Sequence, residues 1–508
     1  MGKNTSPDYI TRVQIFSTRG SDGVWLKTQA GRAGITGPWK ESTLQVLEIV
    51  KSASQIPAFL LHRVSSGNMG RMIGLPHSYL SSECPGIGGR IREELEDFVV
   101  EEIPLYQPCG EGEHVYLRIE KRDLSTMEAV RILGHKLGRP PRDFGYAGLK
   151  DRKGVTQQTI SLGGVSVDEV RSLELEKIEI LSVKRHLNKL RLGHLQGNRF
   201  RIRIRGVSAD AKELAEPIFR LIGELGLPNY FGPQRFGNRG DSHWTGRAFL
   251  VKDYRRAIRR ILGCPSLTEK NPNVVAARRL FMQFRWREAL ERFPGSYREE
   301  KKLLTYLLRV GEKYKGASRL VYRGIMKLYF SAFQSYLFNG VLEERMRAAG
   351  GDPGKLFEGD VAHRHDDGVT FYVDDPAAEA ERVRKFEISP TGPMFGRKMR
   401  IPLGYANEVE LEALAGQRLD HKDFHHLQQG WRMEGGRRPL RVPVTQLSGR
   451  LEGDGMIVEF FLPRGSYATT LLRELMKNET IPPAYADRVP CKQDPAGVFS
   501  APERAGFR

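Results

Sequence analysis

The sequence contains few cysteines and no long apolar run, and both features narrow the class of protein. Its 508 residues include four cysteines, and no two of them have the spacing of metal ligands. Four cysteines in a chain of this length do not make a disulfide framework, which fits a reducing compartment. No run of roughly eighteen apolar residues and no signal-peptide pattern is present. We therefore expect a cytoplasmic protein without a membrane span.

Motifs of cofactor-dependent enzymes are also missing. There is no G-x-x-x-x-G-K-[ST] phosphate loop and no G-x-S-x-G nucleophile elbow. His421 and His425 stand four residues apart, but without a carboxylate at a recognised spacing such a pair is more typical of a surface than of a metal site. The sequence therefore predicts no metal and no organic cofactor.

Positive charge, in contrast, is abundant. The chain has 80 Lys and Arg against 61 Asp and Glu, a formal net charge of +19. Such an excess favours a polyanionic partner, most simply nucleic acid, because neutralising phosphates supplies much of that binding. A basic proteome or a basic disordered tail is the alternative. The basic residues are spread through segments with folded patterns, which favours nucleic acid.

Changes in residue pattern divide the chain into parts. The first part has no clear periodicity, and it is either a real peripheral extension or the product of a start codon assigned too far upstream. Two strand-rich segments flank a stretch of long helical patterns, which we expect to be an inserted domain. The predicted parts are an N-terminal extension (1–71), the first strand-rich segment (72–239), the insertion (240–436), the second strand-rich segment (437–484) and a loose tail (485–508).

Local patterns predict the elements around one charged loop. His114–Arg122 alternates apolar and polar residues with period two, as a half-buried strand does. Ser125 or Thr126 caps a predicted helix that ends near Leu137. The next segment, GYAGLKDRKGVTQQ, is typical of a strand, a loop and a second strand. Asp151 is therefore expected on an exposed loop, where functional residues concentrate.

This loop places one carboxylate among three cations, Lys150, Arg152 and Lys153. Neighbouring positive charge favours the anionic form of Asp151. A carboxylate that stays charged suits a nucleophile or an ion-pair anchor better than a general acid. The alternative is a plain turn, in which Asp and Gly serve local backbone geometry, and composition alone favours that alternative.

Two other segments allow either RNA contact or an ordinary structural role. In GNRFRIRIRGV, apolar residues alternate with arginines, which gives a cationic stripe for RNA or a solvated strand face. NYFGPQRFGNRG interleaves three aromatic rings with two arginines. Rings of this kind can stack on bases, worth about 1–3 kcal/mol per base, or fill a gap in the core.

Five motifs in a fixed order carry a family resemblance: GYAGLKDRKGVTQQ, GNRF, NYFGPQRFG, SAFQSYLFN and LPRGSYATTLLREL. With the opening IREELEDFVVEEI, the sequence resembles the TruD family of tRNA pseudouridine synthases from about Gly86 to Glu479. The resemblance implies an α+β fold, a pseudouridine synthase core with a curved mixed sheet. It also implies an inserted, mostly helical TRUD domain, with RNA lying between the two.

The resemblance also assigns roles to individual residues. Asp151 corresponds to the catalytic nucleophile of the family. Asn198 and Phe200 of GNRF are expected to contact the flipped base, and Phe98 of EDFVV to line the same pocket. Tyr467 stands where relatives can carry Phe. Core packing is the alternative for Phe98 and Tyr467.

Three cations complete the set of expected substrate-binding residues. Lys150 is expected to stabilise charge near the nucleophile, and Lys121 and Arg235 to contact a phosphate or the pocket. By resemblance the reaction isomerises a specific uridine of tRNA, often uridine 13, after the base leaves its stack. It needs no cofactor, metal or obligate protein partner. The alternative is a non-catalytic RNA-binding protein or tRNA chaperone on the same fold, which could have lost any of Asp151, Asn198 or Phe200.

Overall fold

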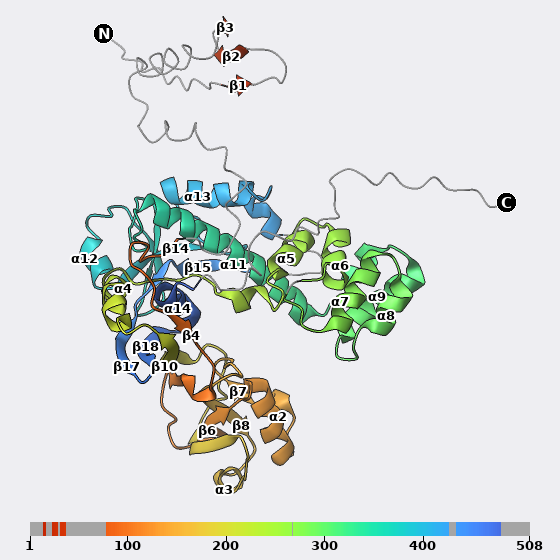
Figure 1. The fold of residues 1–508 in the computed structure, drawn as a ribbon, viewed down its shortest axis with the longest axis vertical. Coiled ribbons are helices and arrows are strands. Elements are labelled where there is room, and N and C mark those ends of the chain that lie inside the picture. Colours follow the sequence, from red (N-terminus) through yellow and green to blue (C-terminus); the bar gives the residue numbers. More distant parts are fainter. Residues whose placement is uncertain are drawn as a thin grey trace, which may run out of the picture. The chain divides into compact units, whose positions relative to one another are not determined.

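The computed structural model describes residues 78–266, 268–425 and 433–478, and the backbone of three strands nearer the N-terminus (Figure 1). The predicted tail, 485–508, lies outside the described residues. Residues Met1–Gly70 are a compact unit by themselves, and the chain from Arg71 onward is a second unit. The first unit holds an antiparallel sheet of β1 (Gln14–Phe16), β2 (Gly23–Thr28) and β3 (Gly31–Thr36).

The second unit is built around a nine-stranded mixed sheet. Along its main path only the pair β5 and β8 is parallel. Two short strands join at the side, β4 (Gly88–Arg90) on β10 and β7 (Gly145–Tyr146) on β8. The order along the path is β17 (Thr445–Glu452), β18 (Gly455–Pro463), β10 (Leu195–Val207), β5 (Phe98–Pro104), β8 (Val155–Gly163), β6 (His114–Arg122) and β9 (Ile178–His186).

One end of this sheet carries the predicted strand and helix that precede the charged loop. Both are confirmed: the strand is β6, and the helix is α2 (Thr126–Lys136). Ser125 caps α2, since its hydroxyl accepts from the Glu128 amide at 3.2 Å and the Glu128 carboxylate accepts from the Ser125 amide at 2.8 Å. This reciprocal pair is a capping box, a purely local signal. With α3 (Val167–Arg171), α2 packs on β6, β8 and β9.

The other end of the sheet packs against α4 (Ala211–Leu225) and α14 (Ala468–Met476). Ile202 and Ile204 of β10 are fully buried in this core. The arginines that alternate with them are paired instead with acidic side chains: Arg201 with Glu459, Arg203 with Glu452 and Arg205 with Asp97. The stripe on β10 is therefore largely neutralised, which favours the solvated strand face over RNA contact.

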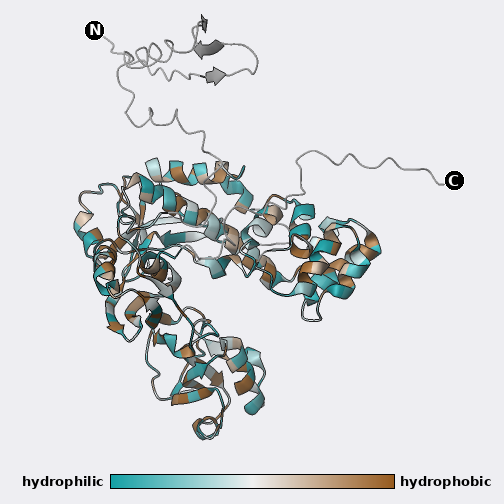
Figure 2. Ribbon diagram, in the orientation of Figure 1, coloured by the Kyte–Doolittle hydropathy of each residue, from teal (hydrophilic) through white to brown (hydrophobic). Residues whose placement is uncertain are grey.

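The two ends of the helical segment lie side by side in the fold. β11 (Leu227–Pro228) pairs with β16 (Arg441–Val442), and we propose these two strands as the ends of the insertion. Its helices carry both apolar and polar residues (Figure 2), as expected of helices that cover a core. They are α5 (Ser242–Leu250), α6 (Tyr254–Leu262), α7 (Pro272–Met282), α8 (Trp286–Arg292), α9 (Arg298–Val310), α10 (Tyr314–Ser318), α11 (Arg323–Ala348), α12 (Ala380–Arg384) and α13 (Gly404–Ala415).

A small antiparallel sheet completes the insertion. It has the order β13 (Thr370–Tyr372), β12 (Val361–Arg364), β14 (Ile388–Met394) and β15 (Gly436–Pro439). The long helix α11 joins two cores, since Phe338 packs with the main sheet and Phe333 with the other helices. Of the helices in the described ranges, none is long and apolar enough to cross a membrane.

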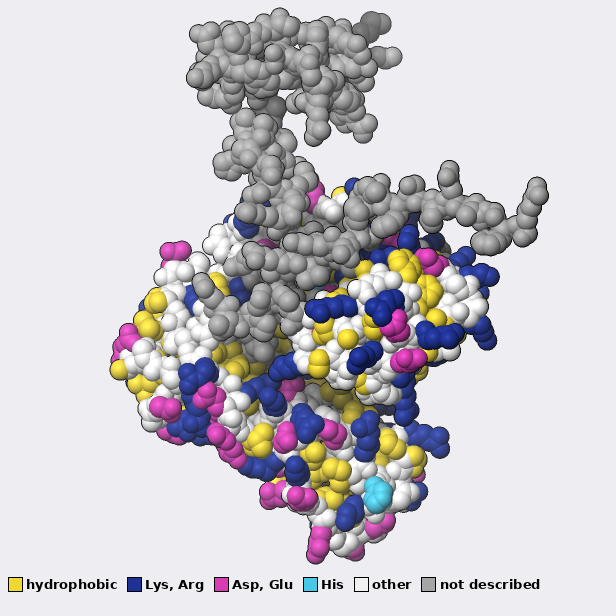
Figure 3. Space-filling model, turned by 45° about the vertical axis from the view of Figure 1, so that its right-hand side comes forward, with side chains coloured by type: hydrophobic (Ala, Val, Ile, Leu, Met, Phe, Trp, Pro, Cys, Tyr) yellow, Lys and Arg dark blue, Asp and Glu magenta, His cyan; other side chains and the backbone are white. Residues whose placement is uncertain are grey.

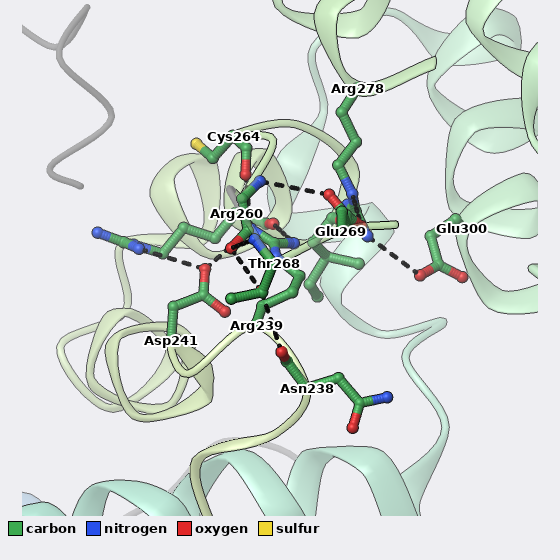
Figure 4. A network of polar contacts seen from close by, with 11 residues as sticks. Asn238, Arg239, Asp241, Arg260, Cys264, Thr268, Glu269, Arg278 and Glu300 are labelled. Atoms are coloured by element: carbon green, nitrogen blue, oxygen red, sulfur yellow. Dashed lines mark hydrogen bonds and ion pairs between the residues drawn. The ribbon is translucent and has the colours of Figure 1, made fainter. Parts of the chain in front are cut away.

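A polar network anchors the start of the insertion (Figure 4). Arg239 donates to Asp241 at 2.8 Å and to the carbonyl oxygens of Arg260 and Cys264 at 2.9 and 2.8 Å. Arg278 is buried and pairs with Glu269 at 2.6 Å. Arg239, one of the two arginines of NYFGPQRFGNRG, is therefore bound within the fold by these contacts.

Candidate active site

Asp151 lies in the loop between β7 and β8, and its side chain is 35% exposed. The loop comes close to the first residue of β5: at Gly154, where φ is +142°, a β-carbon would stand 2.4 Å from the Phe98 carbonyl oxygen. Only glycine tolerates both this backbone conformation and this approach. The loop that carries the aspartate is therefore held against the start of β5.

Two side chains from distant parts of the sequence hold the Asp151 carboxylate. Arg92 donates from Nη2 to Oδ2 at 2.6 Å, and Gln234 donates from Nε2 to Oδ1 at 3.2 Å. The Arg92 guanidinium also lies over the Phe98 ring, 4.0 Å from its centroid. Sequence reasoning missed both partners, although Arg92 stands in IREELEDFVVEEI and Gln234 in NYFGPQRFG. Polar residues inside those two motifs were the available signal.

Lys121 supports the loop from below. Its side chain is fully buried on β6, and Nζ donates to the backbone oxygen of Asp151 at 3.0 Å and to that of Leu124. Burial lowers the pKa of Lys121 to about 8, although the nearby negative charge of Asp151 opposes the shift. Lys121 was expected to contact a phosphate or the pocket, but its amine donates to the main chain of Asp151 and Leu124.

Lys150 is also buried, and its ammonium forms an ion pair with Glu102 in the sheet. Nζ stands 2.5 Å from Oε2 of Glu102 on β5, and the other oxygen of Glu102 accepts from the Thr159 amide at 3.1 Å. The Lys150 amide donates to Thr126 Oγ1 at 2.8 Å. These contacts make Lys150 a link between the loop and the sheet, whereas it was expected to stabilise charge near Asp151.

The residues expected to bind the base share one face of the sheet. In the register of β10 and β5, Asn198 is opposite Glu102. Residues directly opposite each other project to the same side. Phe200 stacks on Phe460 at 5.1 Å between ring centroids and meets Phe98 edge-on at 6.4 Å. Phe98 is 3% and Phe200 7% exposed. Their rings therefore belong to the core at its edge.

Asn198 has an unusual environment on this face. Its side-chain oxygen is buried and has no hydrogen-bond partner within the described part of the chain. A buried acceptor without a partner costs about 1–3 kcal/mol. The atom is therefore suited to accept a hydrogen bond from a donor that the protein itself does not supply.

Tyr467 and Arg235 lie around a different ring, Phe231. Tyr467 precedes α14 and meets Phe231 edge-on at 6.0 Å, and Arg235 lies 5.2 Å from the centre of the same ring. Arg235 also donates to two serines of α11, to Ser335 at 2.8 Å and to Ser331. The aromatic rings of NYFGPQRFG are 2–5% exposed, so they fill the core and do not stack on bases.

Comparison with known proteins places these features in a family. The family model for tRNA pseudouridine synthase D, TruD, matches residues 75–475. The chain belongs to the TruD family. The tRNA pseudouridine synthase D of Geotalea daltonii is 47% identical over 404 residues, which cover 79% of this chain and 100% of that protein. The Thermus thermophilus protein of the same name is 36% identical over 423 residues, 83% of this chain and 98% of that one.

A solved structure extends the comparison to the fold. The putative TruD of Methanosarcina mazei superposes with a TM-score of 0.69 and 26% identity, covering 82% of this chain and 99% of that one. The predicted α+β fold with a mixed sheet is thereby confirmed. As a TruD member the chain is an enzyme, an isomerase of the pseudouridine synthase class. Among the residues that the structure describes, no three His, Cys, Asp or Glu side chains gather as a metal site would require.

Proposed function

We propose that this protein converts a uridine of tRNA, uridine 13 in the first instance, to pseudouridine, with Asp151 as the nucleophile. The observation that carries the proposal is the carboxylate itself. It is positioned by two side-chain donors, it remains 35% exposed, and its loop abuts the strand that bears Phe98. Family membership supports tRNA as the substrate, since the relatives are named for that activity.

The reaction begins when the target uridine leaves its stack, because an enzyme cannot reach the atoms of a stacked base. The flipped uracil carries an N3–H donor. Asn198 Oδ1, which is buried and has no partner among the residues that the structure describes, is the acceptor that this donor needs. Phe200, at the edge of the core on the same face, offers its ring to the base. In the proposed pocket, Asn198 thus recognises one edge of uracil by a hydrogen bond, and Phe200 contacts one face of the ring.

Asp151 then forms a covalent bond to the nucleoside, and the N1–C1′ bond breaks. The uracil turns, C5 bonds to C1′, the carboxylate is released and C5 loses its proton while N1 gains one. Atoms and electrons balance, since the product is an isomer of the substrate. Arg92 stays beside the carboxylate throughout. Its positive charge stabilises the Asp151 anion before attack and again when the carboxylate is released. Lys121 keeps the main chain of Asp151 in place.

Chemical mapping of pseudouridine on tRNA transcripts tests the proposal. Transcripts are incubated with the native protein, treated with carbodiimide and copied by primer extension. One new stop, at uridine 13, is the result expected for the native protein. Transcripts that bind the protein and show no new stop would contradict the proposal. A stop at another uridine would correct the site and leave the reaction standing.

A further inference from the structure

A groove of about 600 Å³ opens in the helical insertion, apart from the candidate active site. The start of α6, one residue of α9 and the segment 312–319 line it. Tyr254, Tyr306 and Tyr314 are half-buried or buried and belong to the core of the helical insertion. Phe98 and Phe200 belong to the other core. The groove therefore shares no residue with the proposed uridine pocket.

Cations surround this aromatic floor. Five of the lining residues are basic and two are acidic. Both acids have partners: Asp253 caps α6 by accepting from the Arg256 amide at 2.9 Å, and Glu312 lies 4.0 Å from Arg255. The other four cations form no ion pair in the described ranges. They are exposed, and they are Lys252, Lys313, Lys315 and Arg319.

The floor of the groove holds a hydroxyl that the protein leaves unbonded. Tyr254 Oη is buried and finds no hydrogen-bond partner in the part of the chain that the structure describes. Tyr254 and Arg319 both line the groove; burial raises the pKa of Tyr254, and the positive charge of Arg319 opposes the shift. An unbonded buried hydroxyl is costly. A donor beside a free cation suits an anionic oxygen.

The same helices carry most of the excess charge of the chain. Residues 242–323 contain 20 Lys and Arg against 7 Asp and Glu, a net charge of +13 out of +19. Figure 3 shows the Lys and Arg side chains, in dark blue, over the right-hand lobe where these helices lie. Such a concentration of charge attracts a polyanion and holds it by counterion release.

We infer that this groove binds the sugar–phosphate backbone of the substrate RNA, at a place other than the target uridine. The inference rests on the proposed function for the identity of the RNA. Phosphate oxygens would accept hydrogen bonds from Lys313, Lys315, Arg319 and Tyr254 Oη. Contacts of this kind fix the position of a nucleic acid and read no sequence. The groove would orient the tRNA while Asp151 acts on one uridine.

A matched pair of arginines tests the inference in the full-length protein. Arg319→Ala removes a groove cation, and Arg287→Ala removes an exposed cation of α8 outside the groove. Affinity for a fluorescent tRNA transcript is measured by anisotropy over a range of KCl concentrations. We expect Arg319→Ala to weaken binding roughly tenfold and to lower the slope of log K against log salt by about 0.7–1. Lys315→Ala should behave alike, and Tyr254→Phe should weaken binding severalfold with an unchanged slope.

Arg287→Ala should stay within about twofold of the native protein, because Arg287 does not line the groove and salt screens an exposed charge that makes no direct phosphate contact. Equal losses in Arg287→Ala and Arg319→Ala would show a diffuse field and overturn the inference. Native affinity in all groove variants would also overturn it, and would assign the groove to another anionic partner, such as an acidic protein.

Pseudouridine formation separates this inference from the proposed function. Groove variants should lose kcat/KM on whole tRNA and keep it on a short stem-loop that carries the target uridine. If the native protein modifies tRNA and the groove variants bind it normally, the inference fails and the proposed function stands. If no tRNA is modified and the groove variants still bind it more weakly than the native protein, the proposed function fails and the groove stands.

Discussion

Replacing Arg92 by Met should disable the enzyme and leave it folded. The change removes the charge-assisted hydrogen bond of 2.6 Å to Asp151 and the guanidinium that lies 4.0 Å from the centre of the Phe98 ring. A hydrogen bond to a charged group contributes about 1.5–3 kcal/mol, which corresponds to a roughly 10- to 150-fold loss of kcat/KM if it acts in the reaction. Loss of the ring contact should also lower the free energy of unfolding by about 0.5–1 kcal/mol at this partly exposed site.

The assay is single-turnover formation of pseudouridine with enzyme in excess, together with thermal unfolding and tRNA affinity. Arg90→Met is the matched control, since Arg90 is 66% exposed and pairs with Glu93. We expect native activity in the control, and in Arg92→Met a slow reaction with tRNA affinity within a few fold. Activity of Arg92→Met within twofold of the native value would refute the assignment of Arg92 to the nucleophile.

Three other changes test the supports of the Asp151 loop. Burial lowers the pKa of Lys121 from 10.5 to about 8, so the folded chain binds fewer protons than the unfolded chain between these pH values. The free energy of unfolding should therefore rise from pH 8 to about 10.5. Chemical denaturation of Lys121→Met should lack this rise, and a rise of native size in the variant would contradict the burial of the Lys121 amine. Glu102→Gln leaves the buried ammonium of Lys150 without its carboxylate and should cost about 3–5 kcal/mol in urea denaturation, whereas a loss under 1 kcal/mol would show that the pair is hydrated. Gln234→Ala removes a hydrogen bond to the charged Asp151 carboxylate, worth about 1.5–3 kcal/mol, and should slow single-turnover formation of pseudouridine roughly 10- to 150-fold at unchanged tRNA affinity; a change in affinity alone would place Gln234 on the RNA.

The sequence predicted the elements around the site well where the signal is local. The strand β6 matches its predicted range, and α2 begins at the predicted cap, because alternation and capping depend on neighbours within a few residues. The motif order predicted the family, and thereby the α+β fold. The loop that carries Asp151 was predicted from the strands on either side of it.

The partners of the Asp151 carboxylate could not be predicted in this way. Arg92 and Gln234 reach Asp151 across 59 and 83 residues of sequence, and only tertiary folding brings them together. Lys150 is adjacent to Asp151 in sequence, yet its side chain pairs with Glu102 in the sheet. Adjacency in a loop does not decide which way a side chain points, whereas burial and an available counter-charge do.

The helical patterns of the insertion illustrate another limit. The apolar pattern from Tyr297 to Lys315 is typical of one continuous helix, whereas the structure divides this stretch into α9 and α10, because Gly311 adopts a φ of +73° after α9. Apolar periodicity continues through such a break, since both helices face the same core. The pattern therefore predicts the buried face better than the point at which a helix ends.

The central claim is that Asp151 is the nucleophile. Formation of pseudouridine releases the hydrogen at C5 of the target uridine, so this release measures whether Asp151 acts. tRNA labelled with tritium at C5 of uridine is mixed with excess native protein, Asp151→Asn, or the control Asp143→Asn, which alters an exposed aspartate just before the same loop. We predict release with the native protein and with Asp143→Asn. With Asp151→Asn we predict none above background, at a tRNA affinity within a few fold of native. Substantial release by Asp151→Asn would contradict the central claim.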